Sequence, residues 1–206
     1  DQILTQLPYL YDAALIALSG EYSSDGQIQR LLDRAGLPYQ GTGPKASARI
    51  WDTAALYQAL RRIGFHIPSY LAMSRTEWVV ARGRKLRQIV TAMGSDLIIR
   101  PNHPHSIDVR AVHTPAQLAD AIEDMSVRYD RFIVQRHLSS LEVDCAVLET
   151  DAGVVPGEPI MADSRLLSPD VSLALQRMAL RAYQAMGMKD YGLIRMLVAH
   201  RRIWIS

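Results

Sequence analysis

The chain has 206 residues, a formal net charge of +2 and a hydrophobic content of 49%. This length and composition allow a buried core in one compact domain or two small ones, and they are not typical of a disordered chain. The small net charge does not indicate a nucleic-acid-binding protein, and no apolar run approaches the roughly 20 residues that a membrane-spanning helix needs.

The cysteine and lysine content gives two further constraints. Cys145 is the only cysteine, which excludes an internal disulfide and favours a reducing, cytoplasmic compartment; we interpret it as a small core residue. Lysine occurs only at Lys45, Lys85 and Lys189, so nearly all positive charge is arginine. Residues 1–11 lack an initiator Met and the pattern of a secretory signal, and we therefore expect the chain to begin inside a longer natural protein.

The first third of the chain alternates between predicted strand and helix. The apolar run over residues 12–18 predicts a buried strand, and residues 27–35 predict a helix followed by Gly36 at its C′ position. Asp52 is typical of an N-cap, for a helix that Gly64 ends. This alternation predicts an α/β layer with parallel pairing.

A different pattern follows, with a boundary near residues 66–72. In chain order we predict a helix over 76–93, strands over 97–100 and 107–111, a helix that begins at Thr114-Pro115, strands over 132–134 and 143–148, a loop over 155–170, a helix over 170–186, and strands over 193–198 and 203–205. The central strands are expected to be antiparallel. The predicted fold class is α+β with an α/β N-terminal part.

Two blocks near the start resemble a known family. Residues 25–32 read D-G-Q-I-Q-R-L-L, and residues 36–43 read G-L-P-Y-Q-G-T-G, with Ala46-Ser47 after them. These resemble the E-D-G-x-I-Q-x-L-L, G-I-P-Y-x-G-S-G and A-S blocks of the D-alanine–D-alanine ligases.

Later segments resemble the same family in the same order. Gly64 and Pro68 match its G-x-x-x-P link, and residues 98–101 (I-I-R-P) match its V-K-P strand. Residues 133–138 resemble its V-E-x-y-i segment, and residues 193–195 resemble the strand that carries its R-x-D motif. The resemblance implies an ATP-grasp fold with a partial preATP-grasp domain.

The resemblance also implies a domain organisation and a reaction. Residues 1–68 would form the partial preATP-grasp domain, and residues 69–206 the ATP-grasp domain, with a small subdomain at 69–138 and a central subdomain at 139–206. In this family ATP phosphorylates the carboxylate of one amino acid, and the amine of a second attacks the acyl phosphate. The implied cofactors are ATP and Mg²⁺, and the implied partners are an adenine nucleotide, a small amino acid and a second copy in a homodimer, with no nucleic acid and no membrane.

Three residues match family positions on the adenosine side. Gln135 would bind the adenine amino group, Leu138 would supply an apolar contact, and Glu142 would meet the ribose hydroxyls. Each also has an ordinary interpretation: Gln135 as an exposed strand residue, Leu138 as part of the core, and Glu142 as a surface charge.

Four further residues complete the candidate site. Arg100 stands at the lysine of the V-K-P strand, Arg136 follows Gln135, and Ser106 survives from a glycine- and serine-rich turn over the phosphates. Arg195 matches the arginine that stabilises negative charge during acyl transfer. The alternative for Arg195 is a strand residue that faces solvent or a cleft.

Other family positions have changed. The lysine of an M-D-K motif is Thr53, the aspartate of R-x-D is Leu197, and the segment 155–167 contains no lysine. The phosphate turn reads N-H-P-H-S-I-D over 102–108, where proline removes one backbone donor. Its two histidines are interpreted as a solvated turn, and no metal ligand is predicted.

The sequence leaves three functions open. The first is an ATP-dependent carboxylate–amine ligase, the ancestral reaction. The second is a non-catalytic, ligase-like protein that acts as a binding or regulatory module, which the combined loss of lysines and of the metal aspartate favours. The third is a divergent ATP-grasp enzyme that uses Arg100 and Arg136.

Overall fold

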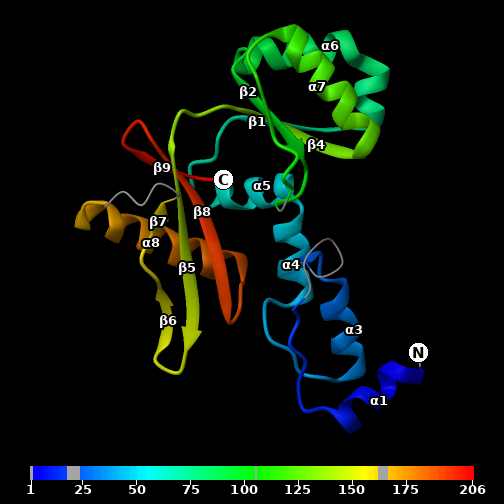
Figure 1. Ribbon diagram of the computed structural model, residues 1–206, viewed down its shortest axis with the longest axis vertical. Helices are drawn as coiled ribbons and strands as arrows, with labels where there is room; N and C mark the ends of the chain where they lie inside the picture. The colour runs from blue at the N-terminus through cyan, green and yellow to red at the C-terminus, as the bar shows by residue number, and fades with distance from the viewer. Residues whose placement is uncertain (1, 18–23, 105, 162–166) are drawn as a thin grey trace. The chain divides into compact units, whose positions relative to one another are not determined.

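The computed structural model describes residues 2–17, 24–104, 106–161 and 167–206. The chain divides into two compact units (Figure 1). Unit 1 consists of residues 1–51 and 141–203, and unit 2 consists of residues 52–140 and 204–206. The predicted division at residues 68 and 138 stays a prediction.

The described residues at the start of unit 1 form the helices α1 (Gln2–Leu10), α3 (Gln27–Ala35) and α4 (Pro44–Trp51). The predicted helix over 27–35 is confirmed, and Gly36 follows it in the left-handed conformation with φ 73°, as a C′ glycine does. The sequence interpretation missed α1 and α4.

The predicted buried strand over 12–18 is wrong for the described residues 12–17. They form one isolated parallel bridge, between Ala14 and Tyr39, and Leu15 is 71% exposed. An apolar run is buried in a parallel sheet when neighbouring strands and helices cover it. In the described part of the chain this run pairs with Tyr39 alone, and its apolar residues are at most half-buried.

The sheet of unit 1 has the strand order β6-β5-β8-β9. These strands are β5 (Leu141–Thr150), β6 (Gly153–Pro156), β8 (Tyr191–Ala199) and β9 (Arg202–Ile205), and β7 (Ile160–Met161) also pairs with β5. The expected antiparallel pairing is confirmed for β5. The predicted loop over 155–170 is wrong where β6 and β7 form; residues 162–166 lie outside the described residues.

Helix α8 (Pro169–Met186) runs along one face of this sheet (Figure 1). Alternate residues of β5, Val143, Cys145 and Val147, are fully buried, which confirms Cys145 as a core residue. The intervening residues Glu142 and Asp144 therefore lie on the other face, because successive side chains of a strand alternate.

Unit 2 contains a second antiparallel sheet with the order β1-β4-β2-β3. Its strands and helices are α5 (Thr53–Arg62), β1 (Tyr70–Ser74), α6 (Arg75–Met93), β2 (Leu97–Pro101), β3 (Arg110–Val112), α7 (Pro115–Arg128) and β4 (Arg131–Arg136). The strand predicted over 107–111 begins later, and Ile107 is fully exposed.

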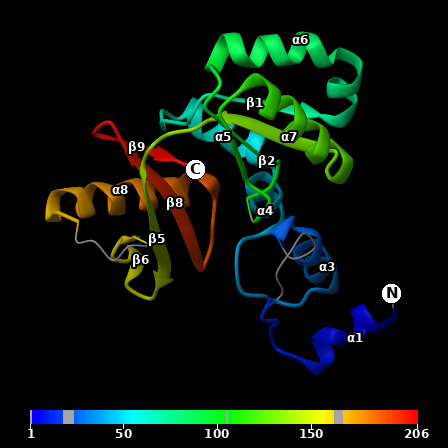
Figure 2. The same ribbon diagram turned by 45° about the horizontal axis from the view of Figure 1, so that its top comes forward.

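Helices α6 and α7 cover one face of this second sheet, as Figure 2 shows. The core between them contains the strand residues Leu97, Ile99, Phe132 and Val134. Helix α7 begins as the sequence predicts, with Thr114 as N-cap before a proline. The helix predicted over 76–93 begins at Arg75, with a capping box at Ser74 that the sequence interpretation did not single out. No helix of the described residues is long and apolar enough to span a membrane.

Candidate functional site

Two of the candidate residues, Arg100 and Gln135, lie on the same face of the sheet in unit 2. Gln135 pairs with Ile98, and Arg100 pairs with Ile133, across the adjacent strands β2 and β4. Since side chains alternate along a strand, Arg100 and Gln135 point away from the core beneath α6 and α7. The structure thus brings together two residues that the sequence assigned to nucleotide binding.

A tyrosine from α5 joins these two side chains. The hydroxyl of Tyr57 accepts a hydrogen bond from Nη2 of Arg100 at 2.7 Å and donates one to Oε1 of Gln135 at 3.2 Å. Tyr57 is fully buried, and Gln135 is only 4% exposed, so the interpretation of Gln135 as an exposed residue is wrong. The sequence interpretation did not single out Tyr57, because its only local signal is an apolar position of a helix.

A second group of polar contacts fixes the start of α5. Asn102, just after β2, accepts a hydrogen bond from the N–H of Ala54 at 2.9 Å and donates one to Asp52 at 2.9 Å. Asp52 caps the helix by accepting from the N–H of Ala55, as predicted, and also binds Arg131 at 2.7 Å. These contacts occupy the backbone donors at the helix N-terminus, which an anion would otherwise use.

These contacts make the stability of unit 2 depend on pH. Burial alone would raise the pKa of Asp52, but hydrogen bonds from Ala55 and Asn102 and the charge of Arg131 outweigh it and lower the pKa. A group with a lowered pKa in the folded state stabilises the protein above its unfolded pKa of about 4, and this contribution is lost as the pH falls. We expect the unfolding free energy of unit 2 to fall as the pH drops below about 5, and to fall less in Asp52→Asn. Denaturant unfolding at a series of pH values measures this; identical slopes in both proteins would contradict it.

The remaining candidates of unit 2 lie apart from Tyr57. Ser106 accepts a hydrogen bond from the N–H of Asp108 within its own turn. Arg136 is exposed at the end of β4, where alternation directs it to the face opposite Gln135. Leu138 is half-buried, and its carbonyl accepts from the hydroxyl of Ser140. His105, part of the predicted solvated turn, lies outside the described residues.

In unit 1, the open face of the sheet carries Glu142 and Arg195. Asp144 is directly opposite Arg195 in the register of β5 and β8, and it binds the guanidinium through both oxygens, at 2.9 Å from Nε and 2.8 Å from Nη2. The hydrogen bond that Arg195 donates to Asp144, followed by the charges of Asp144 and Glu142, raises the pKa of Arg195 despite partial burial. The positive charge of Arg195 is therefore already matched by a carboxylate of the same chain.

The same face holds an apolar side chain at the family's metal position. Leu197 is directly opposite Glu142 and is 6% exposed. Magnesium requires oxygen ligands, and a leucine supplies none. Among the described residues no group of three or more His, Cys, Asp or Glu side chains could hold a metal ion. These residues do not fit a magnesium ion bound in the manner of the family.

The phosphate position in unit 2 is altered as well. Thr53, at the family's lysine position, is 1% exposed, and its hydroxyl has no hydrogen-bond partner among the described residues. Its backbone N–H donates to the carbonyl of Asn102 at 3.3 Å. A buried threonine next to the carboxylate of Asp52 offers no positive charge to a phosphate, so the fit to ATP fails here too.

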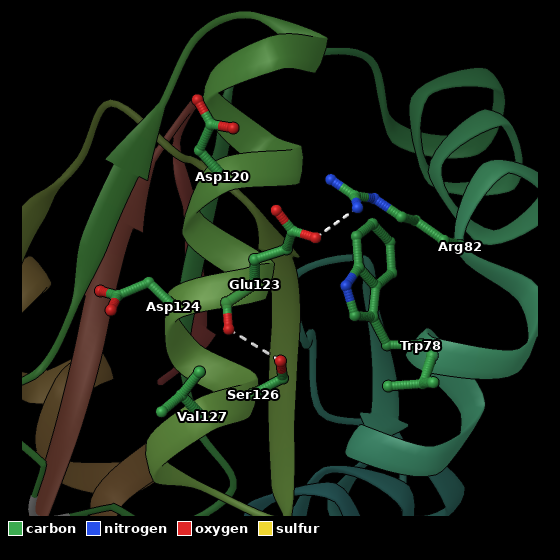
Figure 3. Close-up of a pocket in the computed structure, with 8 residues that line it drawn as sticks. Trp78, Arg82, Asp120, Glu123, Asp124, Ser126 and Val127 are labelled. Carbon is green, nitrogen blue, oxygen red and sulfur yellow. Dashed lines mark hydrogen bonds and ion pairs between the residues drawn. The ribbon is translucent and has the colours of Figure 1, made fainter.

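A hollow of unit 2 lies on the opposite face of its sheet, between α6 and α7 (Figure 3). This shallow groove of about 610 Å³ is bordered by Trp78, Val79 and Val127, and by the ion pair of Arg82 with Glu123. None of the candidate residues lines it. The guanidinium of Arg82 lies 5.7 Å from the centre of the Trp78 ring, so its charge is already engaged.

Comparison with solved structures defines the class of fold. A D-alanine–D-alanine ligase from Coxiella burnetii superposes with a TM-score of 0.85 and 20% sequence identity, over 94% of this chain and 57% of that one. A D-alanine–D-alanine ligase from Bacillus anthracis complexed with ATP gives a TM-score of 0.81 and 21% identity, over 100% of this chain and 69% of that one. The architecture is that of an ATP-grasp protein.

Sequence comparison identifies the family within this class. The family model described as D-ala D-ala ligase C-terminus matches residues 59–167. A D-alanine–D-alanine ligase of Heliobacterium modesticaldum is 32% identical over 205 residues, which cover 88% of this chain and 56% of the relative. The chain belongs to the D-alanine–D-alanine ligase family. It spans a little over half the length of this curated relative.

Proposed function

We propose that this chain is a non-catalytic member of its family, which keeps the ATP-grasp fold as a binding or regulatory module. The observation that carries the proposal is the bidentate pair of Arg195 with Asp144. The family reaction uses the matching arginine to stabilise negative charge as it develops. A guanidinium that already binds both oxygens of a carboxylate cannot serve this purpose without breaking two charge-assisted hydrogen bonds.

The substitutions around the candidate residues support the same proposal. At the positions where the family resemblance places a lysine and an aspartate, this chain has Thr53 and Leu197, which carry no charge. Phosphoryl transfer depends on positioning and on neutralising phosphate charge with lysine, arginine and magnesium. An apolar residue at the metal position and a threonine at a lysine position remove two of these contributions together.

The ancestral ATP-dependent ligation is the second candidate, and family membership favours it. The Bacillus anthracis neighbour is a ligase solved with ATP, and the Heliobacterium relative is named as a D-alanine–D-alanine ligase. For this chain, ATP, Mg²⁺ and D-alanine are therefore the ligands to test.

An assay of ATP turnover separates the two candidates. The purified chain is incubated with ATP, Mg²⁺ and D-alanine, with the Heliobacterium ligase as positive control, and phosphate release and dipeptide formation are measured. We expect neither product above a blank without enzyme. Phosphate release with dipeptide formation, abolished by Arg195→Ala, would overturn the proposal in favour of the ligase.

A further inference from the structure

On the face of the unit 2 sheet opposite α6 and α7, several side chains surround the ring of Tyr57. The ring of Tyr57 is fully buried. The guanidinium carbon of Arg100 lies 5.7 Å from its centre, and the ring of Tyr70 meets it nearly edge-on, with centroids 5.0 Å apart and planes at 68°. Aromatic pairs and cations over a ring are both favourable in such arrangements.

The hydroxyl of Tyr57 uses both of its hydrogen-bonding functions in this position. It accepts from Arg100 and donates to Gln135, and these two side chains come from adjacent strands. The phenol of Tyr57 thus accepts a hydrogen bond from the guanidinium of Arg100 and donates one to the amide oxygen of Gln135, both through the hydroxyl on the edge of its ring. A heterocycle or phenol that bound to Arg100 and Gln135 would have to make the same contacts.

We propose that Tyr57 acts as an internal substitute for a planar aromatic ligand, and thereby excludes such ligands from Arg100 and Gln135. The inference builds on the proposed function, since it names the residue that closes this face to an adenine ring. The excluded class is a planar ring that carries hydrogen-bonding groups on its edge, such as adenine or a phenol.

Contacts within unit 2 hold Tyr57 in place on α5, so the ring blocks Arg100 and Gln135 whether or not a ligand is present. The start of α5 is held to the end of β2 through Asn102, and the hydroxyl of Tyr70 donates to the carbonyl of Ala54 at 3.3 Å. With α5 fixed at its first turn, Tyr57 lies about one turn further along, directly over the sheet. Removing the ring while keeping the helix would leave a space bordered by the groups that Tyr57 now satisfies. Cavities left by large-to-small substitutions collapse only in part, and such cavities bind small aromatic molecules.

The test compares ligand binding to the wild type, Tyr57→Ala and the milder Tyr57→Leu, which keeps part of the packing if the alanine variant does not fold. Leu60→Ala is the matched control, because Leu60 is equally buried on the same helix and its removal leaves the ring of Tyr57 in place. Phenol, adenosine and ATP without Mg²⁺ are titrated against each protein, with calorimetry and thermal shift as readouts.

We expect phenol, adenosine or both to bind the Tyr57 variants at least about tenfold more tightly than the wild type and Leu60→Ala. If the Tyr57 variants bind adenosine as well as phenol, Tyr57 fills a position that fits an adenine ring. If they bind phenol alone, the position fits only a single ring that carries a hydroxyl. Equal binding to all proteins, or no gain in either Tyr57 variant, would overturn the inference. These titrations contain no amino acid and do not measure turnover. A negative result would therefore contradict this inference alone, and the ATP turnover assay would still decide the proposed function.

Discussion

Replacing Leu197 with aspartate, which restores the family's metal-binding residue type, is expected to destabilise unit 1 by about 2 to 4 kcal/mol. Leu197 is buried and lies directly opposite Glu142 on the neighbouring strand. The new carboxylate would lose its hydration and face a like charge across the sheet, which is unfavourable in itself. Hydrogen exchange of the β8 amides, with denaturant unfolding, measures the loss in this unit.

A matched variant on the same strand separates burial and repulsion from a general effect of aspartate in a strand. Leu193 is 61% exposed and lies opposite Ala146, so Leu193→Asp should change stability by less than about 1 kcal/mol. Equal losses in the two variants would assign the effect to aspartate in a strand in general, and would contradict a specific cost of burial and repulsion at Leu197.

The second large effect is expected for Asn102→Ala, with a loss of about 2 to 3 kcal/mol in unit 2. The side chain of Asn102 is buried and bonds both the N–H of Ala54 and the carboxylate of Asp52. Alanine at position 102 would leave the backbone N–H of Ala54 without a partner, and the capping residue Asp52 would lose one of its hydrogen bonds. Chemical denaturation measures the change in unfolding free energy, and hydrogen exchange of the α5 amides shows whether the loss falls on this helix.

Ser106→Ala serves as the control in the same turn. Its hydroxyl accepts one hydrogen bond from the half-buried turn residue Asp108, so its removal should cost about 1 kcal/mol or less. If Asn102→Ala cost no more than Ser106→Ala, Asn102 would not hold the start of α5, and the fixed position of Tyr57 would need another explanation.

Much of the fold follows from local signals in the sequence. Thr114-Pro115 fixes the start of α7, Asp52 the start of α5, and Gly36 the end of α3, because caps depend on residues within one turn of the helix end. The apolar run over 12–18 misled the prediction. Its burial depends on neighbouring strands, and the run itself does not reveal whether these are present.

The contacts of the candidate site could not be predicted in the same way. Tyr57 meets Arg100 and Gln135 across 43 and 78 residues of sequence, and no local pattern marks a tyrosine on an apolar helix face as their partner. Asp144 and Arg195 lie on strands that were both predicted, but their pairing depends on the register of the two strands. The hydrophobic pattern shows which face of the sheet each residue lies on, and it does not show which residue lies opposite. The family resemblance identifies the candidate positions, whereas their partners depend on the tertiary fold.

The division of the chain has a consequence for the order of folding. Almost all of unit 2 is one continuous segment, whereas unit 1 joins residues 1–51 to residues 141–203. The hydrogen bond from the N–H of Gly41 to Asp190 closes a separation of 149 residues. Because closing a long loop costs entropy before its contacts form, the segment 52–140 can fold while the chain is still being synthesised. Unit 1 has to wait for β8, and during that interval its early helix α4 lacks α8, the later helix that it contacts in the folded unit.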